Sequence, residues 1–286
     1  MGLESVASVL SVVVLAVGFA APLRAAVSET MAERGLKRIA EKQRDLFAGA
    51  AEQGEKLDPE AFRLQAESLA HEYELLLRNN PNFTAAYVAY GYMLGKVGMG
   101  DEAAKILLRA NQLDPDIPLV KNQLGNYLAE AGKPLQAAPY YIAAIKLDPN
   151  EPLYHYQLGT LLVEARGEFL RSGEWTRSAL DGAMHYAFKR AAELAPNRFE
   201  FAYRFAESFY DLEQPDWDAA LRAWSELEEK APTDVERQTM RLHAANICVK
   251  LGKPEHAQAL LSTVTEAGLQ TQKEKLLAQL AETATK

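Results

Sequence analysis

The sequence predicts an all-α protein built as a solenoid of helix-turn-helix repeats. Prolines recur 34 residues apart, at Pro81, Pro115 and Pro149, and each of them follows Asn or Asp. A glycine stands ten residues after each of these prolines, and alanines repeat in register behind the glycines. A fixed period of about 20 to 50 residues is typical of architectures in which stacked units bury one continuous core. We therefore expect about five repeats, a partial repeat before them and a C-terminal capping helix, because the last repeat otherwise exposes an apolar face.

The composition of the chain excludes several classes of protein. The chain has 286 residues, with 31 Lys and Arg against 39 Asp and Glu, and its net charge is -8. Its 48% hydrophobic and 24% charged content argues against extensive disorder. The excess of acidic residues argues against nucleic acid as a partner, because neutralising phosphates requires clustered Lys and Arg. The single cysteine, Cys248, cannot form an internal disulfide and is too few for a thiolate zinc site.

The first 25 residues are set apart by an uncharged run from Ser5 to Leu23. We expect residues 1–25 to be a signal peptide, cleaved after Ala20 or Ala25, or an uncleaved membrane anchor. A buried core helix is the third alternative. The first two alternatives predict an exported protein, periplasmic or membrane-anchored. Basic residues follow the run rather than precede it. Because positive charge is enriched on the cytoplasmic side of a membrane span, a cytoplasmic location of the rest of the chain is a further alternative.

One period shows how each repeat folds. Apolar residues at helical spacing predict a helix over 83–97, and the glycines at 98 and 100 predict a turn. Asp101 is expected to cap the next helix, whose buried stripe would be Ala103, Leu107 and Ala110. Pro115 ends that helix, because proline cannot continue a helix and restricts the residue before it. The small residues are expected where two helices cross closely, at Gly91, Gly125, Gly159, Ala103 and Ala137.

This period, with its Gly, Ala, Ala and Pro columns, resembles the tetratricopeptide repeat family. The resemblance implies a right-handed superhelix whose repeats occupy residues 83–268. Residues 26–82 would hold N-terminal helices with a partial repeat, and residues 269–286 the capping helix. The third repeat departs from the pattern by an insertion at about 164–180.

The resemblance also implies a groove lined by the first helix of each repeat, where family members hold a peptide or a partner's helix. Asn and Gln side chains in these columns could bind an extended backbone, and Tyr side chains offer flat apolar area with a polar tip. The alternative is that the tyrosines fill the interior of the superhelix and bind nothing. The predicted partner-binding groove consists of Tyr92, Asn122, Gln123, Asn126, Tyr156, Gln157, Thr160, Tyr203, Arg204, Glu207 and Asn246.

The insertion contains two large apolar residues. Phe169 lies between Gly167 and Gly173, and Trp175 lies two residues after Gly173. One interpretation is a longer helix pair in which both aromatic side chains pack on a neighbour. The other is a partner contact or a lid on the groove, since extra loop length in a solenoid often maps to the binding face.

Catalytic signatures are missing from the sequence. The five histidines show no metalloprotease spacing, and no two of them fall within one helical turn. Cys248 lies in an apolar stretch and is expected to be a small buried hydrophobe. No nucleophile-elbow motif is present. We therefore expect no enzyme activity, catalytic residue, metal or cofactor.

The sequence thus favours a non-catalytic scaffold of the cell envelope that binds a protein or peptide in its concave groove. The alternative is a structural subunit of a larger membrane-associated assembly, which would use its convex face and N-terminal helices. Nucleic acid is not expected as a partner under either hypothesis.

Overall fold

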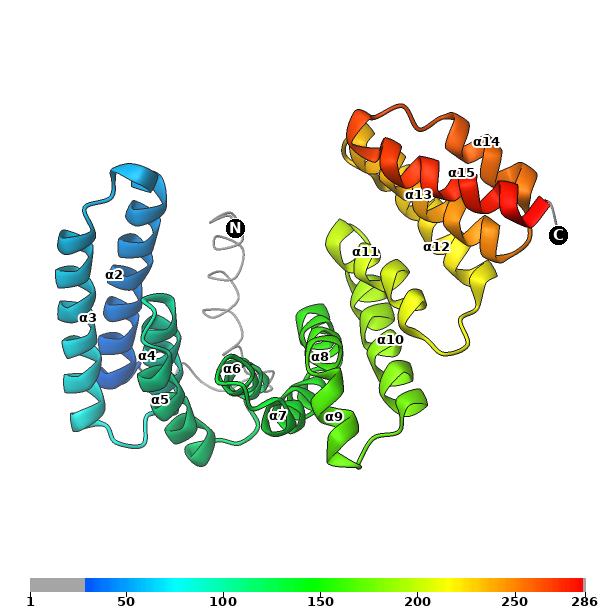
Figure 1. The fold of residues 1–286 in the computed structure, drawn as a ribbon. Helices are drawn as coiled ribbons and strands as arrows, with labels where there is room; N and C mark the ends of the chain where they lie inside the picture. Colours follow the sequence, from blue (N-terminus) through cyan, green and yellow to red (C-terminus); the bar gives the residue numbers. More distant parts are fainter. Residues whose placement is uncertain (1–28, 285–286) are drawn as a thin grey trace. The chain divides into compact units, whose positions relative to one another are not determined.

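The computed structural model describes residues 29–284 and confirms an all-α helical repeat fold (Figure 1). Fourteen α-helices and three short 3-10 helices lie in this range, and no strand occurs within it. The chain forms two compact units: unit 1 ends at Tyr127 and unit 2 begins at Leu128. The expected signal peptide or anchor at residues 1–25 lies outside the described residues. No helix between residues 29 and 284 is long and apolar enough to cross a membrane.

Within each unit, helices that are close in the sequence pack against one another. Unit 1 contains α2 (Met31–Gln53), η2 (Gly54–Lys56), α3 (Pro59–Asn79), α4 (Thr84–Lys96) and α5 (Gly100–Leu113), and α6 (Pro118–Glu130) runs across the unit boundary. Unit 2 contains α7 (Pro134–Leu147), α8 (Pro152–Glu164), α9 (Arg166–Ser172), α10 (Arg177–Leu194), α11 (Phe199–Ser208), η3 (Phe209–Asp211), α12 (Trp217–Lys230), α13 (Asp234–Lys250), α14 (Pro254–Ser262), η4 (Ala267–Leu269) and α15 (Gln270–Ala284).

Glycine turns separate the two helices of a pair, as the sequence predicts. Gly98 has φ 82° and Gly132 has φ 67°, both in the left-handed region that other residues adopt at a cost. The predicted cap at Asp101 is wrong, because α5 already begins at Gly100. Asp101 lies instead in the first turn of α5, where its carboxylate interacts favourably with the helix dipole.

Close helix crossings account for the small-residue columns. A Cβ on Gly91 would lie 2.6 Å from Cγ of Leu107 and 3.5 Å from the carbonyl oxygen of Ala103, so α4 and α5 are in contact here. Ala103, Leu107 and Ala110 are buried, which confirms the predicted stripe. In the third repeat the ring of Phe188 fills the corresponding place, 2.9 Å from a Cβ on Gly159.

The insertion forms α9 and the first turns of α10. Phe169 is fully buried, and Trp175 meets its ring edge-on with centroids 5.9 Å apart. Asp181, only 2% exposed, pairs with Arg166 at 3.2 Å and with Arg177 at 2.6 Å. Phe169 and Trp175 therefore pack as the first interpretation of the insertion requires.

The last helix closes unit 2. Leu280 of α15 is buried in a cluster with residues of α13 and α14. The side-chain oxygen Oε1 of buried Gln238 accepts the backbone N–H groups of Thr265 and Glu266, at 2.7 and 2.8 Å, and so fixes the loop that leads into α15.

Candidate functional site

Seven of the eleven predicted groove residues lie on three first helices of unit 2, namely α8, α11 and α13. We call these side chains the first-helix face of unit 2: Tyr156, Gln157, Thr160, Tyr203, Arg204, Glu207 and Asn246. All seven are half-buried, so each is shielded by neighbours while part of its surface remains open. Contacts between neighbouring helices connect several of these side chains.

Tyr156 joins α8 to α11. Its hydroxyl donates to Oε1 of Glu200 at 2.7 Å, and its ring stacks on Phe201 with centroids 4.6 Å apart. Burial, followed by the hydrogen bond to Glu200, raises the pKa of Tyr156 to about 12. The hydroxyl is therefore a neutral donor at physiological pH, and its ring is fixed from two sides.

A charged pair lies beside this tyrosine. Arg204 forms an ion pair and a hydrogen bond with Glu207 one turn later on α11. The guanidinium also lies over the ring of Phe188, with its carbon 5.0 Å from the centroid. Because Glu207 neutralises Arg204, this part of the face carries little net charge.

Two polar oxygens of α8 have no hydrogen-bond partner. Oε1 of Gln157 and Oγ1 of Thr160 are both shielded from water, and neither is bonded within the described part of the chain. The two residues are three positions apart and so share one side of the helix. An unsatisfied buried polar group costs about 1–3 kcal/mol, and because neither oxygen has exposed surface, a side-chain rotation must turn it outward before the N–H of a ligand can reach it.

The rings of α11, α12 and α13 form the other end of the face. His243 stacks on Trp224 with centroids 4.0 Å apart and planes 5° from parallel, and Tyr203 meets Trp224 edge-on. Burial lowers the pKa of His243 to about 4, so its ring is neutral at pH 7. The Tyr210 hydroxyl lies 3.3 Å from Nδ1 of His243 and accepts from Nδ2 of Asn246 at 3.4 Å.

The other four predicted groove residues lie in unit 1. Tyr92 is half-buried, and the ammonium group of Lys96 lies 5.5 Å from its ring centroid. Gln123 and Asn126 are half-buried on α6. Asn122 is fully buried, and neither polar atom of its side chain has a hydrogen-bond partner among the described residues. The predicted groove residues are thus divided between the two units, and the first-helix face of unit 2 does not include the four that lie in unit 1.

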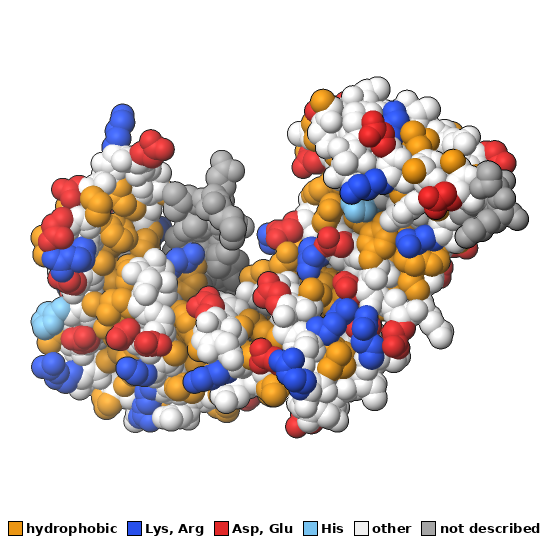
Figure 2. Space-filling view, viewed as in Figure 1, with side chains coloured by type: hydrophobic (Ala, Val, Ile, Leu, Met, Phe, Trp, Pro, Cys, Tyr) orange, Lys and Arg blue, Asp and Glu red, His pale blue; other side chains and the backbone are white. Residues whose placement is uncertain are grey.

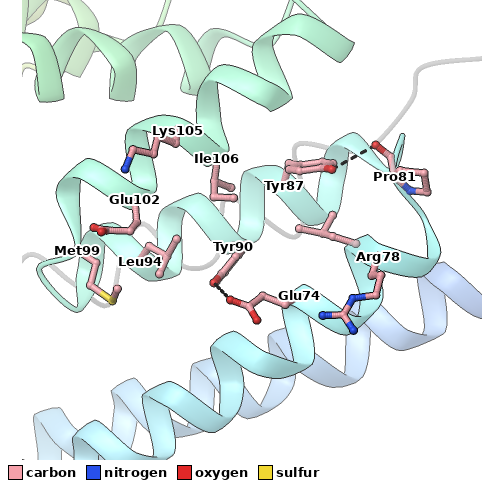
Figure 3. Close-up of a pocket in the computed structure, with 11 residues that line it drawn as sticks. Glu74, Arg78, Pro81, Tyr87, Tyr90, Leu94, Met99, Glu102, Lys105 and Ile106 are labelled. Atoms are coloured by element: carbon pink, nitrogen blue, oxygen red, sulfur yellow. Dashed lines mark hydrogen bonds between the residues drawn. The ribbon is translucent and has the colours of Figure 1, made fainter.

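A separate cleft of about 580 Å³ lies in unit 1. We call it the α3–α5 cleft, because α3 and α5 supply its walls and α4 its floor (Figure 3). Apolar side chains make up most of its lining, and hydrophobic side chains also gather on the visible surface of unit 1 (Figure 2). Its residues are Glu74, Leu77, Arg78, Pro81, Tyr87, Tyr90, Leu94, Met99, Glu102, Lys105 and Ile106.

No family model and no curated protein sequence matches the chain. Solved structures do match. YrrB, described as a TPR protein with an unusual peptide-binding site, aligns at 17% identity with a TM-score of 0.56, over 76% of this chain and 98% of YrrB. The chain has the tetratricopeptide-repeat fold. PilF of Pseudomonas aeruginosa aligns at 13% identity with a TM-score of 0.54, over 86% and 99% of the two chains. A double mutant of MamA from RS-1 aligns at 14% identity with a TM-score of 0.51, over 68% and 94%.

Two features of the structure escaped the sequence analysis. The α3–α5 cleft draws its residues from three helices, and no column of the repeat marks them. The stacked pair of His243 and Trp224 joins a first helix to the preceding second helix. The available signal was a histidine two residues before the mostly apolar stretch at 245–249, but its partner Trp224 lies 19 residues away and cannot be identified from spacing.

Metal-binding chemistry has no visible basis in residues 29–284. No group of three or more His, Cys, Asp or Glu side chains there could hold a metal ion. Cys248 is buried, and burial raises the pKa of its thiol, which keeps it protonated and unreactive.

Proposed function

We propose that this chain is a non-catalytic scaffold of the cell envelope that binds an extended segment of a partner protein on the first-helix face of unit 2. The observation that carries the proposal is the pair of unsatisfied oxygens on α8. Once a side-chain rotation turns them to the surface, Oε1 of Gln157 and Oγ1 of Thr160 can accept N–H groups of a peptide backbone, which every sequence supplies.

The surroundings of these oxygens favour a peptide over a small charged ligand. Tyr156 and Tyr203 offer fixed aromatic area, and such residues are enriched where proteins recognise one another. Arg204 is already paired with Glu207, so it provides no free charge for an anion. YrrB, whose fold the chain shares, is described as having a peptide-binding site, which supports the same class of ligand.

Export is the second part of the proposal, and it rests on the uncharged run from Ser5 to Leu23. We expect the native protein to fractionate with the periplasm or membrane. N-terminal sequencing of the mature chain distinguishes cleavage after Ala20 or Ala25 from a retained anchor. Recovery of the full-length chain in the soluble cytoplasm would contradict export.

Site-specific photo-crosslinking tests the binding face. A photoreactive phenylalanine derivative replaces Tyr203, where it keeps an aromatic ring, or Glu207 in the full-length chain, and in a control it replaces Tyr186. Tyr186 is 60% exposed on α10, the second helix of its pair, and so reports on a different surface. We expect a crosslinked partner band from cells for the first two positions only.

Two results would contradict this assignment. Absence of a crosslink at both Tyr203 and Glu207 would remove the face as a binding site. Crosslinks confined to Tyr186 would favour the structural-subunit alternative, in which second helices make the contacts.

A further inference from the structure

The α3–α5 cleft in unit 1 is independent of the face discussed above. It has a volume of about 580 Å³, within the range of pockets that bind ligands. Its lining is mostly apolar, and Met99 at one end is 44% exposed. Apolar side chains that line an open cleft are stabilised when an apolar group replaces the water in it.

Two carboxylates face this apolar surface from opposite walls. Glu74 projects from α3 and Glu102 from α5, on either side of Tyr90 (Figure 3). The Tyr90 hydroxyl donates to Oε1 of Glu74 at 3.2 Å. Burial, then Glu74 and Glu102, raise the pKa of Tyr90 to about 12, so both negative charges act at the same hydroxyl.

Neither carboxylate forms an ion pair with a Lys or Arg of the described chain. Glu102 forms no ion pair within residues 29–284, and Glu74 has only His71, at 4.0 Å. The two cations that line the cleft, Arg78 and Lys105, likewise form no ion pair there. Arg78 lies at the Pro81 end of the cleft and Lys105 on the α5 wall (Figure 3). A cation brought by a partner would therefore be attracted to the place beside Tyr90 and repelled near Arg78 and Lys105.

We propose that the α3–α5 cleft binds one lysine or arginine side chain carried on an apolar segment of a partner protein. The methylene stem lies on Leu94, Met99 and Ile106, and the charged head lies between Glu74 and Glu102. Lys and Arg side chains suit this place, because their stems pack on apolar surface while their heads stay near water. Arg78 and Lys105 disfavour a polybasic run.

Methyl NMR of the full-length chain tests this proposal. The six methionines are labelled with ¹³C at their methyl groups, and the Met99 signal is assigned from a Met99→Leu variant. The probes are the capped tripeptides Leu-Lys-Leu, Leu-norleucine-Leu, Leu-Glu-Leu and Lys-Lys-Lys. We expect the Met99 signal to shift, with the Lys peptide binding roughly two- to fivefold tighter than the norleucine peptide, as an exposed ion pair allows. The Glu and Lys-Lys-Lys peptides should bind more weakly than the Lys peptide.

Paired variants show whether the two carboxylates are responsible. Glu74→Gln/Glu102→Gln should bind the Lys and norleucine peptides equally. Glu52→Gln/Glu55→Gln changes the net charge of the chain equally, at exposed sites outside the cleft, and should keep the preference for Lys. The proposal is overturned if Met99 does not respond, if Lys and Glu peptides bind alike, or if the first double variant keeps the wild-type preference.

Discussion

Replacing Gly91 by alanine tests whether α4 and α5 pack as closely as the repeat requires. The new Cβ would lie 2.6 Å from Cγ and 2.7 Å from Cδ2 of Leu107, well inside the normal contact distance. Leu107 is only 1% exposed, so it cannot move aside into solvent. Overpacking of this kind costs about 1–3 kcal/mol of folding free energy.

Alanine also has an intrinsic advantage within a helix, and a matched variant measures it. Gly49 lies inside α2 of the same unit, and a Cβ there meets no atom within 4 Å. Gly49→Ala should therefore stabilise by about 0.5–1 kcal/mol, because alanine loses less backbone entropy than glycine. Gly91→Ala gains the same amount but also pays the cost of overpacking, so its net destabilisation should be about 0–2.5 kcal/mol.

Urea unfolding followed by circular dichroism at 222 nm measures both variants against the wild type. Repeat proteins can unfold in parts, so hydrogen exchange of α4 and α5 amides provides the local measurement. Faster exchange there is expected in Gly91→Ala only. Equal stabilisation by the two alanines would refute the close crossing of α4 and α5.

Three further predictions concern unit 2. Asp181→Ala removes the buried carboxylate that pairs with Arg166 and Arg177, while Arg166 keeps Asp211 at 3.3 Å, and should destabilise by about 1–3 kcal/mol in urea unfolding. Asp218→Ala, which removes only an exposed pair, should change stability by less than about 1 kcal/mol. Because burial lowers the folded-state pKa of His243 to about 4, the unfolded chain binds the extra proton between about pH 6.5 and 4. Stability should then fall by up to about 3 kcal/mol as the pH drops through this window, and His243→Gln should flatten that slope; an unchanged slope would show that the ring is not kept neutral by burial.

The repeat columns place some of the predicted groove residues on the same helix, whereas helix packing buries one of them, Asn122. The columns put Gln157 and Thr160 on one helix and Arg204 and Glu207 on the next, where the structure has them. Nothing in those columns shows that Asn122 is fully buried while Gln157 keeps part of its surface open. Whether these residues bind a partner stays a prediction.

The sequence by itself determined the helix pairs, their turns and the small residues at their crossings. Helical periodicity, a glycine with positive φ and a helix-ending proline all act within a few residues, so spacing alone reveals them. The tertiary structure decided the ion pairs of Asp181, the stacking of His243 on Trp224 and the carboxylates across the α3–α5 cleft. These contacts join side chains from different helices, and they depend on helix crossing geometry and rotamers, which a repeat period does not specify.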